Sequence, residues 1–251
     1  MARAWFRFYE ELNDFLAPER RKSSFEHVFD RRASVKDFIE SFGVPHPEVE
    51  LILVNGEPVG FGYIVGDGDR VSVYPVFESI DVFELVKLRP QPLRRMRFVL
   101  DVHLGVLARY LRLCGFDTLY RNDYEDEVLA QISAAQQRIL LTREGALLKL
   151  KIVTHGYCVR RDKPREQLAE VVARFDLYRL IHPFRRCARC NGCLKDVPKS
   201  AIEHRLEPLT RRYYEHFTIC DQCQRLYWRG SHFGPIQRLI ASLARPTPMN
   251  P

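Results

Sequence analysis

The segment from residue 98 to residue 175 alternates short apolar runs with helical patterns, and this alternation constrains the fold more than any other feature of the chain. The first run, 98–100, ends at Asp101 and is followed at once by apolar residues at helical spacing up to Cys114. Further strands are expected at 117–120, 138–142 and 156–159, and helices at 124–137, 144–151 and 164–175. Strands that alternate with helices form parallel sheets, so the prediction is an α/β domain with a parallel sheet.

Carboxylates lie where these elements meet. Asp101 follows the first strand, Asp126 falls in the first turn of a helix, and Glu144 comes just after the third strand. In a parallel sheet these positions share one edge, where gathered carboxylate oxygens can bind Mg²⁺ or Mn²⁺. Such an ion supports hydrolysis of a phosphodiester. Alternatively, the acids around Asp126 simply favour the start of a helix.

Five of the seven cysteines lie between residues 187 and 223. Cys187 with Cys190 and Cys220 with Cys223 form two CxxC pairs, the pattern of a structural zinc site with four thiolate ligands. The 29 residues between the pairs exceed the usual spacing, so this insert is expected to carry structure of its own. Cys193 offers a rival partner for Cys190. A redox pair is the alternative, although it would not need the second CxxC.

The basic charge is concentrated in the last third of the chain. Residues 160–251 hold 18 Lys and Arg against 9 Asp and Glu, whereas residues 1–159 hold 21 against 23. This balance favours a polyanionic partner such as RNA, although a merely solvated basic surface is the alternative. The start of the sequence has no signal-peptide core and no segment is apolar enough to span a bilayer, so a cytoplasmic protein without a membrane partner is expected.

Several basic residues are candidates for nucleic-acid contacts. Those near the expected sheet edge and the cysteines are Arg109, Arg112, Arg143, Lys149, Arg186, Arg189 and Arg229. Around the cysteines, aromatic side chains such as Tyr227 and Trp228 interleave with the arginines and offer stacking faces for unpaired bases. Alternatively, the cations pair with nearby acids, and the aromatic residues pack a small zinc-bound core.

Residues 1–85 read as a small α+β unit. Two strands are followed by a helix with Ser34 as its N-cap and Gly43 at its end, and the pair Asn55-Gly56 predicts a hairpin turn. This order resembles the ubiquitin-like β-grasp fold of the sulfur carriers for thiamine and molybdopterin. Those carriers act through a free C-terminal Gly-Gly, whereas this chain continues into a linker at 86–96, so carrier chemistry is excluded. A binding or structural role remains, and a protein partner is one candidate.

Five stretches carry a resemblance that covers nearly the whole chain: DVHLGVLARYLR at 101–112, GFDT at 115–118, RND at 121–123, RILLTR at 138–143 and THG at 154–156. With the cysteine pairs and YWRGSH at 227–232, they resemble the Mut-seven C-terminal ribonuclease family, whose bacterial members often carry a ubiquitin-like N-terminal domain. The resemblance implies a PIN-like RNase domain at 97–180, a zinc ribbon at 181–245 and endonucleolytic cleavage of RNA, with tRNA or another structured RNA as candidates.

The same resemblance assigns roles to the acids. Asp101, Asp126 and Glu144 would hold Mg²⁺ or Mn²⁺, Asp123 is a candidate fourth catalytic acid, and Cys193 is a spare thiol beside the structural zinc. The family usually has Thr-Arg-Asp at the third position, whereas this chain has Thr142-Arg143-Glu144. Glutamate keeps the charge but adds one methylene, which shifts the carboxylate.

Three hypotheses follow from these residues. The first is a metal-dependent ribonuclease in which the zinc ribbon assists RNA binding. The second is a non-catalytic RNA-binding adaptor, in which the acids are structural and Glu144 marks a degenerate PIN-like site. The third, a toxin-like or stress-linked nuclease, differs from the first in its biology and not in its chemistry.

Overall fold

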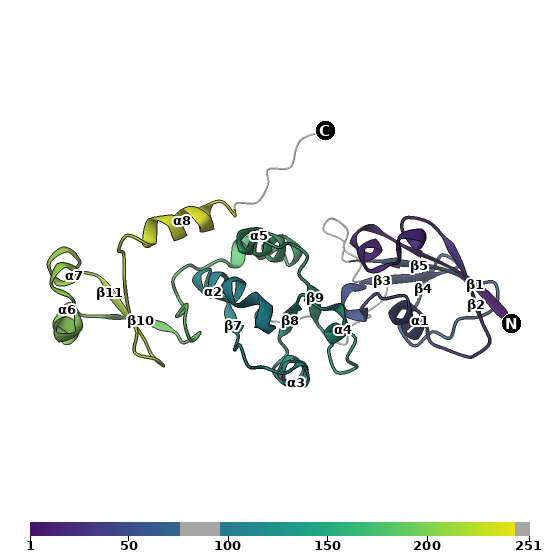
Figure 1. Cartoon of the computed structure of the whole chain (residues 1–251), viewed down its shortest axis with the longest axis horizontal. Helices are drawn as coiled ribbons and strands as arrows, with labels where there is room; N and C mark the ends of the chain where they lie inside the picture. The colour runs from purple at the N-terminus through teal and green to yellow at the C-terminus, as the bar shows by residue number, and fades with distance from the viewer. Residues whose placement is uncertain (76–95, 244–251) are drawn as a thin grey trace. The chain divides into compact units, whose positions relative to one another are not determined.

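The computed structural model describes residues 1–75 and 96–243 (Figure 1). The chain divides into two compact units, the first made of residues 1–95 and 125–158, the second of residues 96–124 and 159–251. The predicted linker at 86–96 lies outside the described residues except for Met96, and so do the last positions of the predicted zinc ribbon, 244–245.

The first unit begins with a five-stranded sheet in the order β2-β1-β5-β3-β4. Its strands are β1 (Ala2–Phe8), β2 (Phe25–Phe29), β3 (Leu51–Val54), β4 (Glu57–Pro58) and β5 (Arg70–Tyr74). β1 runs antiparallel to β2 and parallel to β5. Short 3-10 turns lie at η1 (Glu10–Phe15), η2 (Pro18–Arg20) and η3 (His46–Glu48). The predicted β-grasp fold is confirmed.

Helix α1 (Val35–Ser41) covers one face of this sheet (Figure 1). It begins where the sequence predicts, because Ser34 and Asp37 form a capping box in which each side chain accepts the other's backbone N–H. The helix buries Phe38 and Ile39 against inward-facing residues of β1 such as Phe6. The predicted hairpin turn also forms: Asn55 and Gly56 take positive φ angles of 53° and 90° between β3 and β4.

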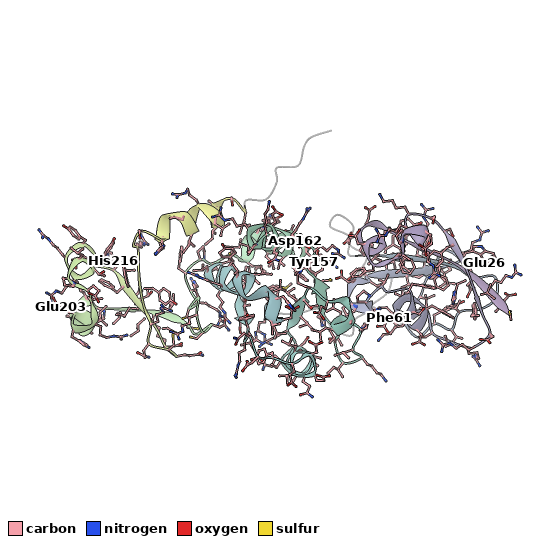
Figure 2. The ribbon with its side chains drawn as sticks, in the orientation of Figure 1. Glu26, Phe61, Tyr157, Asp162, Glu203 and His216 are labelled. Atoms are coloured by element: carbon pink, nitrogen blue, oxygen red, sulfur yellow. The ribbon has the colours of Figure 1, made fainter. Side chains whose placement is uncertain are left out.

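The rest of the first unit is α3 (Asp126–Gln136), β8 (Ile139–Thr142), α4 (Gly145–Leu148) and β9 (Gly156–Cys158). β8 and β9 are parallel, and Tyr157 on β9 is buried (Figure 2). Two predicted helix boundaries are wrong. The helix expected from 124 begins at Asp126, and the helix expected to reach 151 ends at Leu148. Beyond Leu148 the chain turns and buries the side chain of Val153, which a longer helix would carry elsewhere.

The second unit contains β6 (Arg97–Leu100), η4 (Val102–Leu104), α2 (Gly105–Leu113), β7 (Asp117–Leu119), α5 (Pro164–Arg174) and η5 (Leu177–Leu180). β6 and β7 are parallel, and α2 packs against α5. Each unit thus holds one pair of parallel strands, β6 with β7 here and β8 with β9 in the first unit. The predicted α/β region with parallel strands is confirmed.

The C-terminal part of the second unit is a small antiparallel sheet in the order β10-β11-β12. The strands of this sheet are β10 (Leu194–Val197), β11 (Phe217–Cys220) and β12 (Leu226–Trp228). The helices of this part are α6 (Lys199–Ile202), η6 (Glu203–Arg205), α7 (Pro208–Tyr213) and α8 (Phe233–Ala241). The insert between the two CxxC pairs therefore carries structure, as expected. Within residues 1–75 and 96–243, none of the helices has the length and apolar character needed to cross a membrane.

Candidate functional site

Asp101 comes directly after β6, as the sequence predicts. The residue is buried, with 4% of its surface exposed, and its Oδ1 accepts the backbone N–H of His103 at 2.8 Å. Asp101 is thus the N-cap of η4, and the His103 ring lies nearby, with its Nδ1 3.6 Å from Oδ1. A buried carboxylate must be hydrogen bonded or paired, and this cap fixes the direction of the side chain.

Asp126 and Asp123 are both exposed, but their surroundings differ. Asp126 is the first residue of α3, and the N-cap residue of that helix, Glu125, makes no side-chain capping bond. Asp123 accepts two hydrogen bonds from the guanidinium of Arg121, at 2.9 and 2.6 Å. These hydrogen bonds lower the pKa of Asp123. A metal ion at Asp123 would therefore compete with Arg121.

Glu144 occupies the N-cap position of α4 and is exposed. Its backbone N–H donates to Oγ1 of the buried Thr142 at 2.9 Å, and its side chain makes no capping bond. Asp101 and Asp123 belong to the second unit, whereas Asp126 and Glu144 belong to the first. The convergence of these carboxylates on one metal ion therefore stays a prediction.

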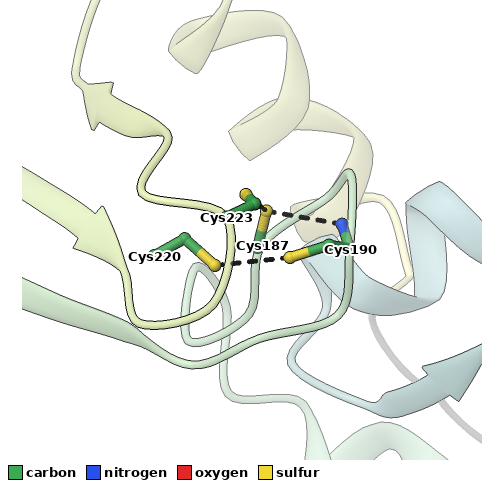
Figure 3. Close-up of side chains that lie close together, drawn as sticks. All are labelled: Cys187, Cys190, Cys220 and Cys223. Carbon is green, nitrogen blue, oxygen red and sulfur yellow. Dashed lines mark hydrogen bonds between the residues drawn. The ribbon is translucent and has the colours of Figure 1, made fainter.

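The four cysteines of the two CxxC pairs gather around one point (Figure 3). Their sulfur atoms all lie within 4.8 Å of one another, with 3.6 Å between Cys187 and Cys223 and 3.4 Å between Cys190 and Cys220. Among the described parts of the chain, no other group of three or more His, Cys, Asp or Glu side chains is close enough to hold a metal ion. Cys193 is exposed and does not belong to the cluster.

The loop that carries Cys187 and Cys190, residues 187–192, is called the first knuckle below. Asn191 takes a positive φ of 73°, and Gly192 follows it without a side chain. A Cβ atom at Gly192 would come within 2.7 Å of the sulfur of Cys220, so glycine is required for the two CxxC loops to approach each other. The hydroxyl of Tyr227 lies 3.0 Å from the sulfur of Cys187.

The cluster fits a divalent metal ion. Zn–S bonds of about 2.3 Å in a tetrahedron hold sulfur atoms roughly 3.8 Å apart, close to the spacings here. Burial raises the pKa of Cys190 to about 12. Burial also acts to raise the pKa of Cys187, but hydrogen bonds from Tyr227 and from backbone amides outweigh it and lower the pKa to about 6. Sulfur atoms this close cannot all carry charge unaided, and a bound cation would allow four thiolates to coexist.

The first knuckle is fastened to the α/β part of the same unit. Arg112 on α2 is buried, and its guanidinium donates to the carbonyl oxygens of Thr118 and Arg189 at 2.9 and 2.8 Å. The side chain of Asn191 accepts the backbone N–H of Thr118 at 2.9 Å and donates to Asp117 at 2.7 Å. The sequence reasoning missed this role of Asn191, although an Asn-Gly pair directly after a cysteine is a local turn signal.

The basic residues proposed from sequence divide into two groups. Arg112 is committed to the knuckle, Arg186 donates to the carbonyl of Asn191 and lies 3.7 Å from Asp117, and Lys149 donates to the carbonyl of Glu40. Arg143 is half-buried. The exposed members of the set are Arg109, Arg189 and Arg229. Phosphate contacts are therefore most accessible at these three.

Two buried residues of the N-terminal domain, absent from the predicted site, contact the segment that follows Glu144. His46 lies with Nδ1 2.7 Å from the carboxylate of Glu40 and Nε2 2.8 Å from the carbonyl of Val153. Glu48 is fully buried and accepts the backbone N–H of Cys158 at 2.6 Å. The partners are more than 100 residues apart, so no local pattern in the sequence marks them.

Two family models match the chain. The model described as the Mut7-C RNAse domain matches residues 96–240, and the model described as Mut7-C ubiquitin matches residues 1–81. The first match covers the strands, the acids and the cysteine cluster together, and the second covers the five-stranded sheet. No curated protein and no solved structure matches the chain.

Proposed function

Since the chain belongs to the Mut7-C RNAse family, we propose that it hydrolyses phosphodiester bonds of RNA at a carboxylate-bound Mg²⁺ or Mn²⁺ ion. The match of the RNase family over residues 96–240 carries this proposal. The position of Asp101 at the end of β6 supports it, because α/β sheets place their chemistry at the C-terminal ends of strands.

The proposed ligands are Asp101, Asp126 and Glu144. The bound ion would activate water and stabilise the charge that develops on the scissile phosphate. Asp101 would give the site its rigid member, because its carboxylate is buried and held by the N–H of His103. Asp126 and Glu144 are exposed at the starts of helices, where hard oxygen donors can turn toward an ion. Asp123 would join only if Arg121 releases it.

The remaining parts of the proposal concern RNA and zinc. We assign zinc to the four-cysteine cluster, which can hold a metal ion. We assign the binding of RNA phosphates to the exposed Arg109, Arg189 and Arg229. The zinc-bearing module would thereby assist RNA binding. Endonucleolytic cleavage of a tRNA or another structured RNA in the cytoplasm, and a protein partner for the N-terminal domain, are further parts of the proposal.

A circular RNA substrate, used beside a linear one, tests whether the cleavage is endonucleolytic, because an exonuclease cannot cut a circle. The full chain is incubated with circular RNA and Mn²⁺ or Mg²⁺, beside Asp101→Asn and Glu127→Gln. Asparagine still caps η4 but removes the charge, so we expect the Asp101 variant to lose more than about 10-fold in cleavage rate. The Glu127 variant removes an exposed charge next to Asp126 and should cleave like the wild type.

Intact circles with the wild-type chain across a range of both metals would contradict endonucleolytic cleavage, and intact linear RNA under the same conditions would contradict the ribonuclease proposal. Equal cleavage by the wild type and the Asp101 variant would contradict the assigned site. Glu144 in place of aspartate favours the second candidate, a non-catalytic RNA-binding adaptor. That candidate predicts an RNA that is bound by the wild type and never cut.

A further inference from the structure

The N-terminal sheet has an outer face that helix α1 does not cover (Figure 1). Along β1, side chains alternate between the two faces: Phe6 and Phe8 enter the core, whereas Arg3, Trp5 and Arg7 are exposed. β1 lies between β2 and β5 in the sheet, so these exposed residues stand on its interior and not at its edge. Trp5 has 37% of its surface exposed, which is unusual for so large an apolar side chain in mid-sheet.

Strand β5 adds further residues of the same kind to this face. The register pairs Trp5 with Arg70, which is exposed, and Arg7 with Ser72. At the end of the row, the rings of Tyr9 and Tyr74 stack with centroids 4.2 Å apart and planes 12° apart. The term outer face below means the six residues Arg3, Trp5, Arg7, Tyr9, Arg70 and Tyr74.

Guanidinium groups on the outer face stand beside these rings. The guanidinium carbon of Arg7 lies 5.1 Å from the ring centroid of Tyr9, and Arg70 is the register partner of Trp5. Planar rings stack on unpaired bases, and guanidinium groups bind phosphates. A sheet face on which aromatic rings and guanidinium groups alternate therefore has the groups needed to bind a single-stranded nucleic acid.

Acids stand beside this face, and both of those named here contact Arg3, although Glu26 is the register partner of Trp5. Glu26 on the neighbouring strand β2 (Figure 2) lies 3.2 Å from the guanidinium of Arg3, and Asp67 accepts the backbone N–H of Arg3 at 2.7 Å. Val28 on β2 is an exposed apolar neighbour. An apolar protein partner would require a broader apolar patch than Trp5 and Val28 supply. The cations Arg7 and Arg70 therefore favour a polyanion.

We propose that the outer face binds an unpaired segment of RNA, with a base stacked on Trp5 and phosphates held by Arg7 and Arg70. This inference rests on the proposed function for the identity of the ligand. It adds a substrate feature: the RNA that the chain cuts would carry a single-stranded region that the N-terminal domain holds.

The chain contains two tryptophans, Trp5 and Trp228, so Trp228→Phe leaves Trp5 as the single tryptophan reporter. The full chain with this change is titrated with a 12-nucleotide oligouridine in buffer without Mg²⁺ or Mn²⁺, where a cleavage that depends on these ions cannot proceed. We expect saturable quenching of Trp5 fluorescence. Arg7→Gln with Arg70→Gln should raise the Kd at least about 10-fold and reduce the slope of log Kd against log salt by about 1.4, since each phosphate contact on a single strand contributes about 0.7.

The matched control is Arg31→Gln with Arg32→Gln, which removes two exposed charges from a loop outside the outer face and should leave the Kd within about 2-fold. A second arm keeps Trp228 in place: anisotropy of labelled oligouridine should report weaker binding by Trp5→Ala, by at least about 5-fold, because base stacking on an aromatic ring is worth that much or more.

Unchanged Trp5 fluorescence on RNA addition would overturn the inference and leave the outer face to a protein partner. Equal Kd values for the two arginine pairs would overturn it as well. These binding results are independent of cleavage, which is measured separately with Mn²⁺. Quenching without cleavage would contradict the ribonuclease proposal alone, and cleavage without quenching would contradict the outer-face inference alone.

Discussion

Arg112 fastens helix α2 to the first knuckle through a guanidinium group that is almost entirely inside the protein. It donates to three backbone carbonyls, that of Thr118 on one side of the contact and those of Ala188 and Arg189 on the other. Arginine suits this position because its planar group directs several donors at fixed angles, which the single ammonium of lysine does not. Burial lowers the pKa of Arg112, and the nearby thiols and Asp117 oppose that shift.

Replacing Arg112 with methionine keeps much of its volume but leaves these three carbonyl oxygens without this donor. We expect the free energy of unfolding to fall by about 2 kcal/mol or more, since each buried polar group left unpaired costs roughly 1–3 kcal/mol. Urea denaturation measures the change. Arg109→Met on the exposed side of the same helix is the control and should stay within about 0.5 kcal/mol. Equal losses in both variants would contradict the assigned role of Arg112.

Glu144 offers a second test at a single position, which rests on the proposed metal site. Glu144→Asp gives the residue that the family resemblance implies at this position and keeps the charge, so we expect it to retain Mn²⁺ binding and RNA cleavage. Glu144→Gln removes the charge and should weaken Mn²⁺ binding by more than about 10-fold. Electron paramagnetic resonance of free Mn²⁺ reports the binding directly. Unaltered binding by Glu144→Gln would remove Glu144 from the ligand set.

At the scale of elements, the end of strand β9 depends on a residue of the N-terminal domain. Glu48 is the last residue of the 3-10 turn η3, and its side chain accepts the backbone N–H of Cys158, the last residue of β9. In the same turn, Nε2 of His46 lies 2.8 Å from the carbonyl oxygen of Val153. Lys149, just after α4, donates to the carbonyl of Glu40. The short helix and strand after Glu144 are therefore held by the β-grasp domain as well as by their own sheet.

Replacing Glu48 with alanine should release this end of β9. The N–H of Cys158 would lose its acceptor and a small cavity would form, so we expect a loss of about 2–4 kcal/mol. Amide hydrogen exchange should accelerate at residues 156–158 in particular. Glu57→Ala, on exposed β4, removes a carboxylate without such a contact and should leave both stability and exchange unchanged. Unchanged exchange at 156–158 in the Glu48 variant would contradict the proposed capping.

His27 on strand β2 is expected to make the stability of the chain depend on pH. Burial, and secondly the charge of Arg20, lower the pKa of His27 from its usual value near 6.5. The folded state therefore binds the proton more weakly than the unfolded state, so stability is lost as the pH falls below about 6.5. Between pH 7 and pH 5.5, we expect the Tm of His27→Gln to fall less than the Tm of the wild type. The Tm of the control, His204→Gln at an exposed position, should fall as much as that of the wild type. The reverse order would contradict the sign of the shift.

Elements with local start and stop signals could be predicted from the sequence. The capping box at Ser34, the turn at Asn55-Gly56 and the proline that opens α5 each depend on neighbours within a few residues. The four cysteines of the cluster could be predicted for the same reason, since each pair depends on a local spacing. The end of α4 was misjudged because it is decided by contacts with residues more than 100 positions away, such as the one between Lys149 and Glu40.

At the scale of the whole molecule, the α/β part and the cysteine module of the second unit contact each other closely. The domain boundary near residue 180 stays a prediction, and one family model and one compact unit hold the residues on both sides of it. Gly115 shows how closely they meet: its φ is +99°, and a Cβ atom there would collide with the carbonyl of His182. His182 and Phe184 in turn donate backbone hydrogen bonds to Cys114 and Leu113 at the end of α2.

This arrangement predicts that loss of the metal spreads beyond the cysteines. The full chain should carry about one zinc per molecule, and Cys193→Ser should keep it while Cys220→Ser should lose it. Without the ion, the first knuckle loses its fixed shape, and the bonds from Asn191 to Asp117 and Thr118 weaken with it. Hydrogen exchange after chelation should therefore accelerate at 117–119 as well as at 187–223, while residues 1–75 stay protected. Unchanged exchange at 117–119 in zinc-free protein would show that β7 holds its place without the knuckle.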